Sequence, residues 1–328
     1  MGDLKNILLT GASGFIGSHL VEELVNAGKS ITILLRSKNR LGCLKFVNSK
    51  LLRKCRIFEG NIINYNDVKV AVKGNDAILH LASNSGFSST MDNTAEIIET
   101  SLLGVNNIIH AAKDTNVEKI LFTSSSDVYG KPNYLPVDEL HPLCGRSIYA
   151  MSKIASEVLL KHLSKQYGIN VSILRLFNTY GPRQSNRGVI PSIIEQLLTS
   201  EEIKVGNISS SRDFTYISDT ITGIIKVLES KTIMNQIINI GSGNNHRVSN
   251  VIDRIFLITG NNKTIITKMK NKRPSELEIN EIVCDNQKLK NLIDWEPSIS
   301  IEIGLKKTIA WYKSIDNYKI ELDEVILN

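Results

Sequence analysis

A glycine-rich turn near the N-terminus constrains this chain more than any other feature. An apolar run over residues 7–10 leads directly into TGASGFIGSHL, which continues with helical period. In a GxxGxxG spacing, Gly11 permits a tight turn, Gly14 lets the backbone approach a pyrophosphate, and Gly17 lets the helix pack closely on the strand. A strand, a glycine turn and a helix N-terminus in this order predict a dinucleotide-binding site. The residues expected to line it are Gly11, Ser13, Gly14, Phe15, Ile16 and Gly17.

Short apolar runs alternate with longer stretches of helical period through the first half of the chain. The runs cover residues 7–10, 31–35, 56–58, 77–81, 120–123 and 171–176. This alternation is typical of βαβ units, and wholly apolar runs suit strands that helices cover on both faces. We therefore expect an α/β fold built on a doubly wound parallel sheet of the Rossmann type.

The composition changes after about residue 178. Beyond it lie the turn TYGPRQSNRG, a helical stretch over residues 189–198 and a polar stretch over residues 261–275. We expect residues 1–178 to form the dinucleotide-binding domain. Residues 179–328 are expected to form mainly a smaller, mixed substrate-binding lobe, with segments that return to the first domain.

Charge and hydropathy exclude several classes of partner. Lysine and arginine total 39, and aspartate and glutamate total 33, so the net charge is only +6 over 328 residues. Nucleic-acid-binding proteins gather basic residues on one face or helix, so we expect a small acidic ligand and no nucleic acid. No apolar stretch approaches about 18 residues, and the chain starts without a leader pattern. We expect a cytoplasmic protein with no membrane partner.

No metal site is expected. The four cysteines lie far apart without a CxxC pair, which indicates reduced thiols. The six histidines show no HExxH spacing.

The end of the second apolar run bears on the choice of cofactor. Arg36, followed by Ser37 and Lys38, stands where an acidic residue would bind a ribose 2′-hydroxyl. A guanidinium suits a 2′-phosphate, which slightly favours NADP over NAD, although Arg36 stacked on the adenine or exposed to solvent is the open alternative. Later strand ends supply further expected cofactor-binding residues, namely Asn61, Ile62, Leu81, Ala82 and Ser83.

The candidate catalytic residues lie between the fifth and the sixth apolar runs. Tyr149 and Lys153 are four residues apart on an expected helix and so share one face. An ammonium and a positive nicotinamide beside the phenol would lower its pKa from about 10 and make it a base. Tyr149 would then take a proton from a sugar hydroxyl that Ser125 holds. Tyr149 and Lys153 would also contact the cofactor.

Eight motifs, in order, resemble a known family. They are TGASGFIGSHL, HLAS, SSSDVYG, YAMSK, RLFNTYGPRQ, RDFTYISD, NIGSG and DWEPSISIEIGL. Together they are similar to the extended short-chain dehydrogenase/reductase superfamily, in its nucleotide-sugar epimerase/dehydratase branch. The resemblance covers about residues 5–313. The stretch from residue 175 to residue 311 looks most like bacterial UDP-N-acetylhexosamine 4,6-dehydratases, and UDP-glucuronate decarboxylases are also similar.

The resemblance implies a nucleotide-diphosphate sugar as substrate. Ser125, Tyr149 and Lys153 match the family's catalytic positions. It also implies a homodimer with a four-helix interface formed by residues 95–113 and 147–167. The positions that match substrate-binding residues are Asn178, Arg183, Val205, Asn207, Arg212 and Arg273.

Departures from the family pattern bear on the reaction. Dehydratases of this branch follow the catalytic Thr or Ser with Asp-Glu or Ser-Glu, whereas this chain has Ser126 and Asp127. Simple 4-epimerases carry small neutral residues there, so Asp127 favours a 4,6-dehydratase in which it removes the C5 proton. The open alternatives are a 4-epimerase, a C4 dehydrogenase or reductase, and a noncatalytic binding protein. Ser101 and Leu103 also replace two family asparagines.

Overall fold

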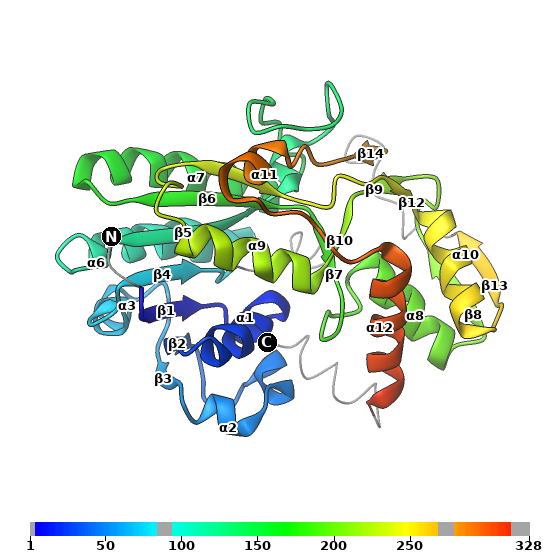
Figure 1. Ribbon diagram of the computed structural model, residues 1–328, viewed down its shortest axis with the longest axis horizontal. Coiled ribbons are helices and arrows are strands. Elements are labelled where there is room, and N and C mark those ends of the chain that lie inside the picture. The colour runs from blue at the N-terminus through cyan, green and yellow to red at the C-terminus, as the bar shows by residue number, and fades with distance from the viewer. Residues whose placement is uncertain (1–3, 84–93, 268–278, 316–328) are drawn as a thin grey trace.

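A seven-stranded parallel sheet forms the centre of the computed structural model, which describes residues 4–83, 94–267 and 279–315 (Figure 1). The strand order is β11-β6-β5-β4-β1-β2-β3. The strands are β1 (Asn6–Thr10), β2 (Ser30–Leu35), β3 (Arg56–Glu59), β4 (Ala77–His80), β5 (Lys119–Ser125), β6 (Val171–Leu176) and β11 (Ile237–Ile240). The order reverses between β1 and β4, which confirms the predicted doubly wound, Rossmann-type fold.

Helices cover both faces of this sheet, because side chains alternate between faces along each strand. Leu8 packs into the apolar cluster that contains α3 (Tyr65–Val72), α6 (Gly104–Ala112) and α7 (Ile148–Tyr167). Its neighbours Ile7 and Leu9 pack into the opposite cluster, together with α1 (Phe15–Asn26) and α9 (Ile217–Glu229). The apolar runs of the sequence are thus central strands buried on both sides.

Shorter elements connect the strands of the first half. They are η1 (Gly42–Phe46), α2 (Ser49–Leu52), α5 (Thr94–Ile98), the π-helical η2 (Glu99–Leu103) and η3 (Ser126–Tyr129). The continuous helix expected over residues 95–113 is therefore interrupted. The Ser101 carbonyl within η2 accepts a hydrogen bond from Ser156 Oγ of α7 at 3.3 Å, and side-chain insertion of this kind is a recognised cause of such interruptions.

The second half builds smaller sheets beside the main one. β7 (Asn178–Tyr180) pairs with β10 (Phe214–Tyr216), and β8 (Glu202–Val205) pairs with β13 (Thr264–Thr267). A third sheet contains β9 (Ser211–Arg212), β12 (His246–Arg247) and β14 (Glu281–Ile282). The remaining helices are α8 (Val189–Thr199), α10 (Val248–Thr259), α11 (Gln287–Ile293) and α12 (Ile301–Ser314).

This lobe lies beside the carboxyl ends of the central strands, where α8, α10 and α12 are grouped in Figure 1. Strand β11 comes from the same half of the chain but forms the edge of the main sheet beside β6. Within the described residues, no helix is both long and apolar enough to span a bilayer.

Candidate active site

The carboxyl end of β5 and the first turns of α7 bring the four predicted catalytic residues together. Ser125 ends β5, and its hydroxyl accepts a 3.1 Å hydrogen bond from the Asp127 amide. Ser147 caps α7 by accepting a hydrogen bond from the Ala150 amide at 3.1 Å, so Tyr149 lies in the first turn. The Tyr149 and Ser125 hydroxyls are hydrogen-bonded.

Tyr149 has a raised pKa in the protein alone. Burial is the largest cause, and the nearby Asp127 carboxylate raises the pKa further, while the hydrogen bond from Ser125 lowers it. The lowered pKa expected from an ammonium together with a positive nicotinamide concerns the enzyme with its cofactor bound, and it stays a prediction. Lys153 Nζ lies 5.8 Å from the centroid of the Tyr149 ring, and its recorded hydrogen bond goes to the Thr123 carbonyl at 2.7 Å.

Lys153 is itself strongly perturbed. Only 3% of its surface is exposed, and this burial lowers its pKa to about 7, although the Glu157 carboxylate acts in the opposite direction. A lysine that titrates near neutrality can change its charge within the working range of an enzyme.

The glycine turn has the close backbone packing that its sequence predicts. Gly11 has a φ of +74°, and a Cβ at Gly17 would lie 2.2 Å from the Gly11 carbonyl oxygen. A Cβ at Gly11 would lie 2.7 Å from the Ala82 amide nitrogen. The ends of β1 and β4 therefore meet without intervening side chains. They lie next to the N-terminus of α1, whose first turn contains no acidic residue.

The adjoining residues fit a dinucleotide. Ser83 Oγ is buried and has no hydrogen-bond partner among the described residues, which leaves a donor for a ligand beside the glycine turn. Asn61 Oδ1 accepts from the Ile63 amide at 3.3 Å, and the Ile62 carbonyl accepts from Asn107 Nδ2 at 3.0 Å. Backbone packing rather than side-chain charge thus shapes this part of the site.

Arg36 lies at the end of β2 among acidic groups. Its Nη1 atom is 3.4 Å from Oε1 of Glu96 in α5, and the two side chains are 56% and 47% exposed. Glu59 Oε2 accepts a hydrogen bond from the Lys38 amide at 3.2 Å. Basic residues follow β2 in the sequence, and folding brings the Glu96 carboxylate, 60 residues further along the chain, next to Arg36.

The predicted substrate residues are spread over the second half. Asn178 is exposed at the start of β7 and pairs in register with Phe214, two residues after Arg212. Arg212 is partly buried and its Nη1 donates to the Ser211 carbonyl at 2.8 Å. Val205 is 6% exposed at the end of β8, and Asn207 follows it. Arg273 lies outside the described residues.

Arg183 has an internal partner. Its Nη2 donates to Glu22 Oε2 of α1 at 2.6 Å and to the Phe46 carbonyl at 3.3 Å. The side chain is 9% exposed, and its backbone has a φ of 69°. The Arg183 carbonyl accepts a hydrogen bond from the Cys43 thiol. This arginine therefore joins the smaller lobe to the dinucleotide-binding domain.

A buried ion pair, which the sequence patterns did not predict, lies behind the predicted catalytic residues. Arg175 of β6 and Glu157 of α7 are 1% and 0% exposed, and Arg175 Nη2 lies 2.7 Å from Glu157 Oε2. Two signals were available in the sequence. Glu157 continues the four-residue spacing of Tyr149 and Lys153, and Arg175 interrupts an otherwise apolar run, which requires a buried partner. No cluster of possible metal ligands occurs within the described residues.

The sequence profile of the GDP-mannose 4,6 dehydratase family matches residues 8–308. This match covers the glycine turn, the Ser125–Tyr149–Lys153 group and most of the smaller lobe. The chain belongs to the extended short-chain dehydrogenase/reductase family, in its nucleotide-sugar epimerase/dehydratase branch. It is an enzyme of that NAD(P)-dependent type.

Similar proteins support this membership over nearly the full length. A UDP-N-acetyl-alpha-D-glucosaminuronate decarboxylase from Bacillus cytotoxicus is 35% identical, covering 95% of this chain and 99% of the relative. A putative UDP-glucose 4-epimerase from Methanocaldococcus jannaschii is 33% identical, covering 94% of this chain and 98% of the relative. Both are similar to this short-chain dehydrogenase/reductase, and they differ from each other in reaction.

A solved structure adds a ligand-bound comparison. The UDP-glucuronic acid 4-epimerase of Bacillus cereus, in complex with UDP-glucuronic acid and NAD, superimposes with a TM-score of 0.85 at 26% identity. It covers 94% of this chain, and 99% of the epimerase chain is matched. A dTDP-glucose 4,6-dehydratase from Streptomyces venezuelae gives a TM-score of 0.88 at 25% identity, with 97% of this chain and 99% of that chain covered.

The buried Lys153 makes stability depend on pH. Its pKa is about 7 in the folded protein and about 10.4 in an unfolded chain, so between these values the unfolded state holds the extra proton. The free energy of unfolding should therefore rise with pH in this window. Replacing Lys153 with Met should flatten the slope by about 1 kcal/mol per pH unit. Urea titrations of the cofactor-free protein at pH 7, 8 and 9 measure this; identical slopes would contradict it.

Proposed function

We propose that this protein is a nucleotide-sugar 4,6-dehydratase. The observation that carries the proposal is the place of Asp127. Its amide donates a 3.1 Å hydrogen bond to Ser125 Oγ, and its carboxylate raises the pKa of the Tyr149 phenol. A carboxylate beside the group that acts on C4 is well placed to act on the adjacent C5. A 4-epimerase needs no such base, because it only transfers hydride to the opposite face of C4.

The proposed reaction divides two proton transfers between two side chains. Tyr149, as phenolate, takes the proton of the C4 hydroxyl while Ser125 holds that hydroxyl by a hydrogen bond. The resulting ketone acidifies C5, and Asp127 removes the C5 proton. The protonated Asp127 then donates this proton to the C6 hydroxyl, which leaves as water, and the proton held by Tyr149 returns to C5 when hydride adds to C6. NAD or NADP, when bound, would supply the hydride chemistry between C4 and C6.

Two regions of this chain would hold the cofactor. The turn at Gly11 and Gly17 would receive the pyrophosphate at the N-terminus of α1, and Ser83 offers its unused hydroxyl. Tyr149 and Lys153 would lie against the nicotinamide ribose. Asn61 would bind the adenine.

The nucleotide diphosphate would bind at the second lobe. Arg212 of β9 suits a diphosphate because a guanidinium donates in pairs to phosphate oxygens. Asn178 of β7 pairs in register with Phe214 of β10, two residues after Arg212. Val205 would contact the base, and Arg273 would add a second cation. Arg183 is left out of this set because it is paired with Glu22.

A second candidate reaction is decarboxylation of a nucleotide-linked uronic acid. It is favoured by the 35% identical relative, a UDP-N-acetyl-alpha-D-glucosaminuronate decarboxylase. Oxidation at C4 would again come first, because a ketone at C4 stabilises the carbanion left at C5 when carbon dioxide departs. Asp127 would then deliver a proton to C5 instead of removing one.

NAD is the proposed cofactor. Read alone, Arg36 slightly favours NADP, but the Glu96 carboxylate next to it would repel a 2′-phosphate and compete for the guanidinium. The epimerase from Bacillus cereus was solved with NAD.

A cytoplasmic location also belongs to this proposal, since all four cysteines are free thiols.

A homodimer through α5, η2 and α7 is proposed as well. Five large apolar side chains on these elements are between 41% and 61% exposed, and an exposed apolar group of this kind marks a contact surface. They are Ile98, Leu103, Ile148, Met151 and Val158.

Product masses test the reaction. Purified protein incubated with UDP-, dTDP- and GDP-linked hexoses and uronic acids, with NAD, should remove one water from one hexose without accumulating reduced cofactor. Asp127→Asn should lower the rate of water loss by at least about 100-fold, because the C5 base is lost. Oxidation at C4 should persist in this variant. The matched control Asp138→Asn, in the loop before α7, should keep the wild-type rate.

Other masses would contradict dehydration. Loss of carbon dioxide from a uronic acid would establish the decarboxylase, and an unchanged mass with a new stereoisomer would establish the epimerase. Loss of two hydrogens with stoichiometric reduced cofactor would establish the dehydrogenase.

Replacing Glu96 with Gln should shift the cofactor preference toward NADP. Removing its charge releases Arg36 for a 2′-phosphate, so NADP affinity should rise by roughly threefold to tenfold, in line with an exposed charge pair. NAD affinity should change little. Calorimetric titration of both cofactors measures this. Glu99→Gln is the matched control on the next turn; an equal gain there, or persistence of the gain when Arg36 is also replaced by Ala, would refute the mechanism.

Val158→Glu should convert the dimer to a monomer. A charge buried in an apolar interface without a partner is strongly unfavourable. Light scattering after size-exclusion chromatography measures the mass. Leu257→Glu, on the 84% exposed Leu257 of α10, should leave the dimer intact. A monomeric wild-type protein would refute this interface.

A further inference from the structure

Three successive turns of α7 each bond to the end of β5. Tyr149 is hydrogen-bonded to Ser125, Lys153 Nζ donates to the Thr123 carbonyl at 2.7 Å, and Glu157 Oε1 accepts from Ser124 Oγ at 2.6 Å. The three side chains recur every four residues and so lie on one face of the helix. Glu157 is the member of this series that has no part in the proposed chemistry.

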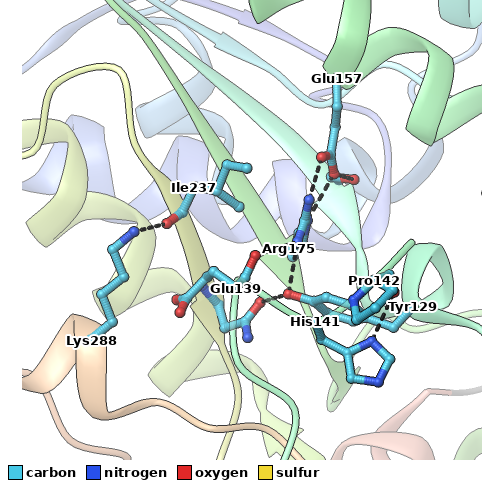
Figure 2. Close-up of polar contacts among 10 residues, drawn as sticks. Tyr129, Glu139, His141, Pro142, Glu157, Arg175, Ile237 and Lys288 are labelled. Carbon is cyan, nitrogen blue, oxygen red and sulfur yellow. Dashed lines mark hydrogen bonds and ion pairs between the residues drawn. The ribbon is translucent and has the colours of Figure 1, made fainter. Parts of the chain in front are cut away.

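A buried arginine completes the attachment of Glu157. Arg175 Nε donates to Glu157 Oε1 at 3.1 Å, and Nη2 donates to Oε2 at 2.7 Å, which makes the pair bidentate (Figure 2). Ser124 and Arg175 face each other in the register of β5 and β6. The carboxylate thus joins one helix to two neighbouring strands at the same level of the sheet.

The attachment extends beyond Arg175 to a third strand. Arg175 Nη1 donates to the Tyr129 hydroxyl at 3.0 Å, and that hydroxyl donates to Asn239 Oδ1 of β11 at 2.6 Å. Tyr129 closes η3, the short helix that carries Asp127. The same network therefore supports the elements that bear Ser125, Asp127 and Tyr149.

Packing alone does not account for this arrangement. A buried ion pair is costly to desolvate and can often be replaced by apolar residues without loss of stability, so its presence suggests another purpose. Glu157 lies one helical turn from Lys153, whose burial disfavours the protonated form. The Glu157 carboxylate raises the pKa of that lysine and so opposes the effect of burial.

We propose that Glu157 is a positioning residue for Tyr149 and Lys153, holding α7 on the end of β5 through Ser124 and Arg175 and supplying the negative charge that keeps Lys153 protonated. Its effect on turnover rests on the proposed function, whereas its effect on Lys153 does not.

The other titratable groups around Lys153 come from three elements. Tyr149 shares α7 with it. His80 of β4 is buried and has a pKa lowered to about 3 by burial and by Lys153, so it is neutral. Asp127 of η3 acts on Tyr149. Glu157 is in turn faced by Arg175 and, further along α7, by Lys161.

Two variants separate charge from position. Glu157→Gln keeps an oxygen for Ser124 but removes the charge, so the midpoint of Lys153 protonation should fall by about one pH unit. Glu157→Asp keeps the charge but shortens the reach, so this midpoint should stay near that of the wild type. Carbon-13 NMR of lysine labelled at Cε measures the midpoint without cofactor or sugar. The Lys153 signal is assigned by its absence from Lys153→Arg.

Turnover gives the second readout. Both variants should lower kcat at pH 7 by roughly tenfold or more, with KM changed less than about threefold. Glu157→Asp loses the alignment of Tyr149, and Glu157→Gln loses the charge of Lys153. Glu22→Gln is the matched control, since it removes the carboxylate that pairs with Arg183, whose side chain is 9% exposed. It should move neither the midpoint nor kcat.

A purely structural role has a distinct signature. Because Arg175 without its partner destabilises the fold, the double variant Glu157→Gln, Arg175→Met provides a folded protein that still lacks the carboxylate. It should retain the lowered Lys153 midpoint. A wild-type midpoint in both Gln variants would overturn the proposal, whatever substrate the enzyme uses. A lowered midpoint with no turnover by any variant or by the wild type would leave the Lys153 effect established and refute only the nucleotide-sugar reaction.

Discussion

The contact between α7 and the carboxyl end of β5 organises the rest of this structure. Tyr149 and Lys153 lie on the helix, and Ser125 ends the strand. Side chains of the helix are hydrogen-bonded to Thr123, Ser124 and Ser125. Since parallel strands end at one edge of a sheet, the same edge also presents the glycine turn after β1. Catalytic and cofactor-binding groups thus converge without a long loop to bring them together.

Burial gives this contact its chemical properties. It lowers the pKa of Lys153 to about 7 and raises that of Tyr149, so in the protein alone burial disfavours the charged form of both groups. Charges that compensate must therefore come from the surroundings. The Glu157 carboxylate provides the charge that favours protonated Lys153. A positively charged nicotinamide would provide the charge that favours the Tyr149 phenolate. This dependence couples the chemistry of the site to occupancy by the cofactor.

Two arginines illustrate how tertiary partners redirect a basic side chain. Arg36 lies at a strand end suited to a 2′-phosphate, but Glu96 accompanies it. Arg183 lies in a motif that resembles the substrate-binding region, but Glu22 neutralises it and ties the smaller lobe to α1. In both cases the carboxylate comes from an element distant in the sequence, so motif position alone does not decide what the guanidinium binds.

The sequence by itself determined the fold class and the family, and it predicted the members of the catalytic group. Apolar runs and the glycine turn express local rules, because strand burial and helix packing depend on nearby residues, and Tyr149 and Lys153 share a face through helical spacing alone. Only the tertiary structure decided the pairings of Arg175 with Glu157, Arg183 with Glu22 and Arg36 with Glu96. It also decided that the pKa of Tyr149 is raised in the protein alone. Charge partners and burial depend on contacts between distant segments, and these arise only when the chain is folded.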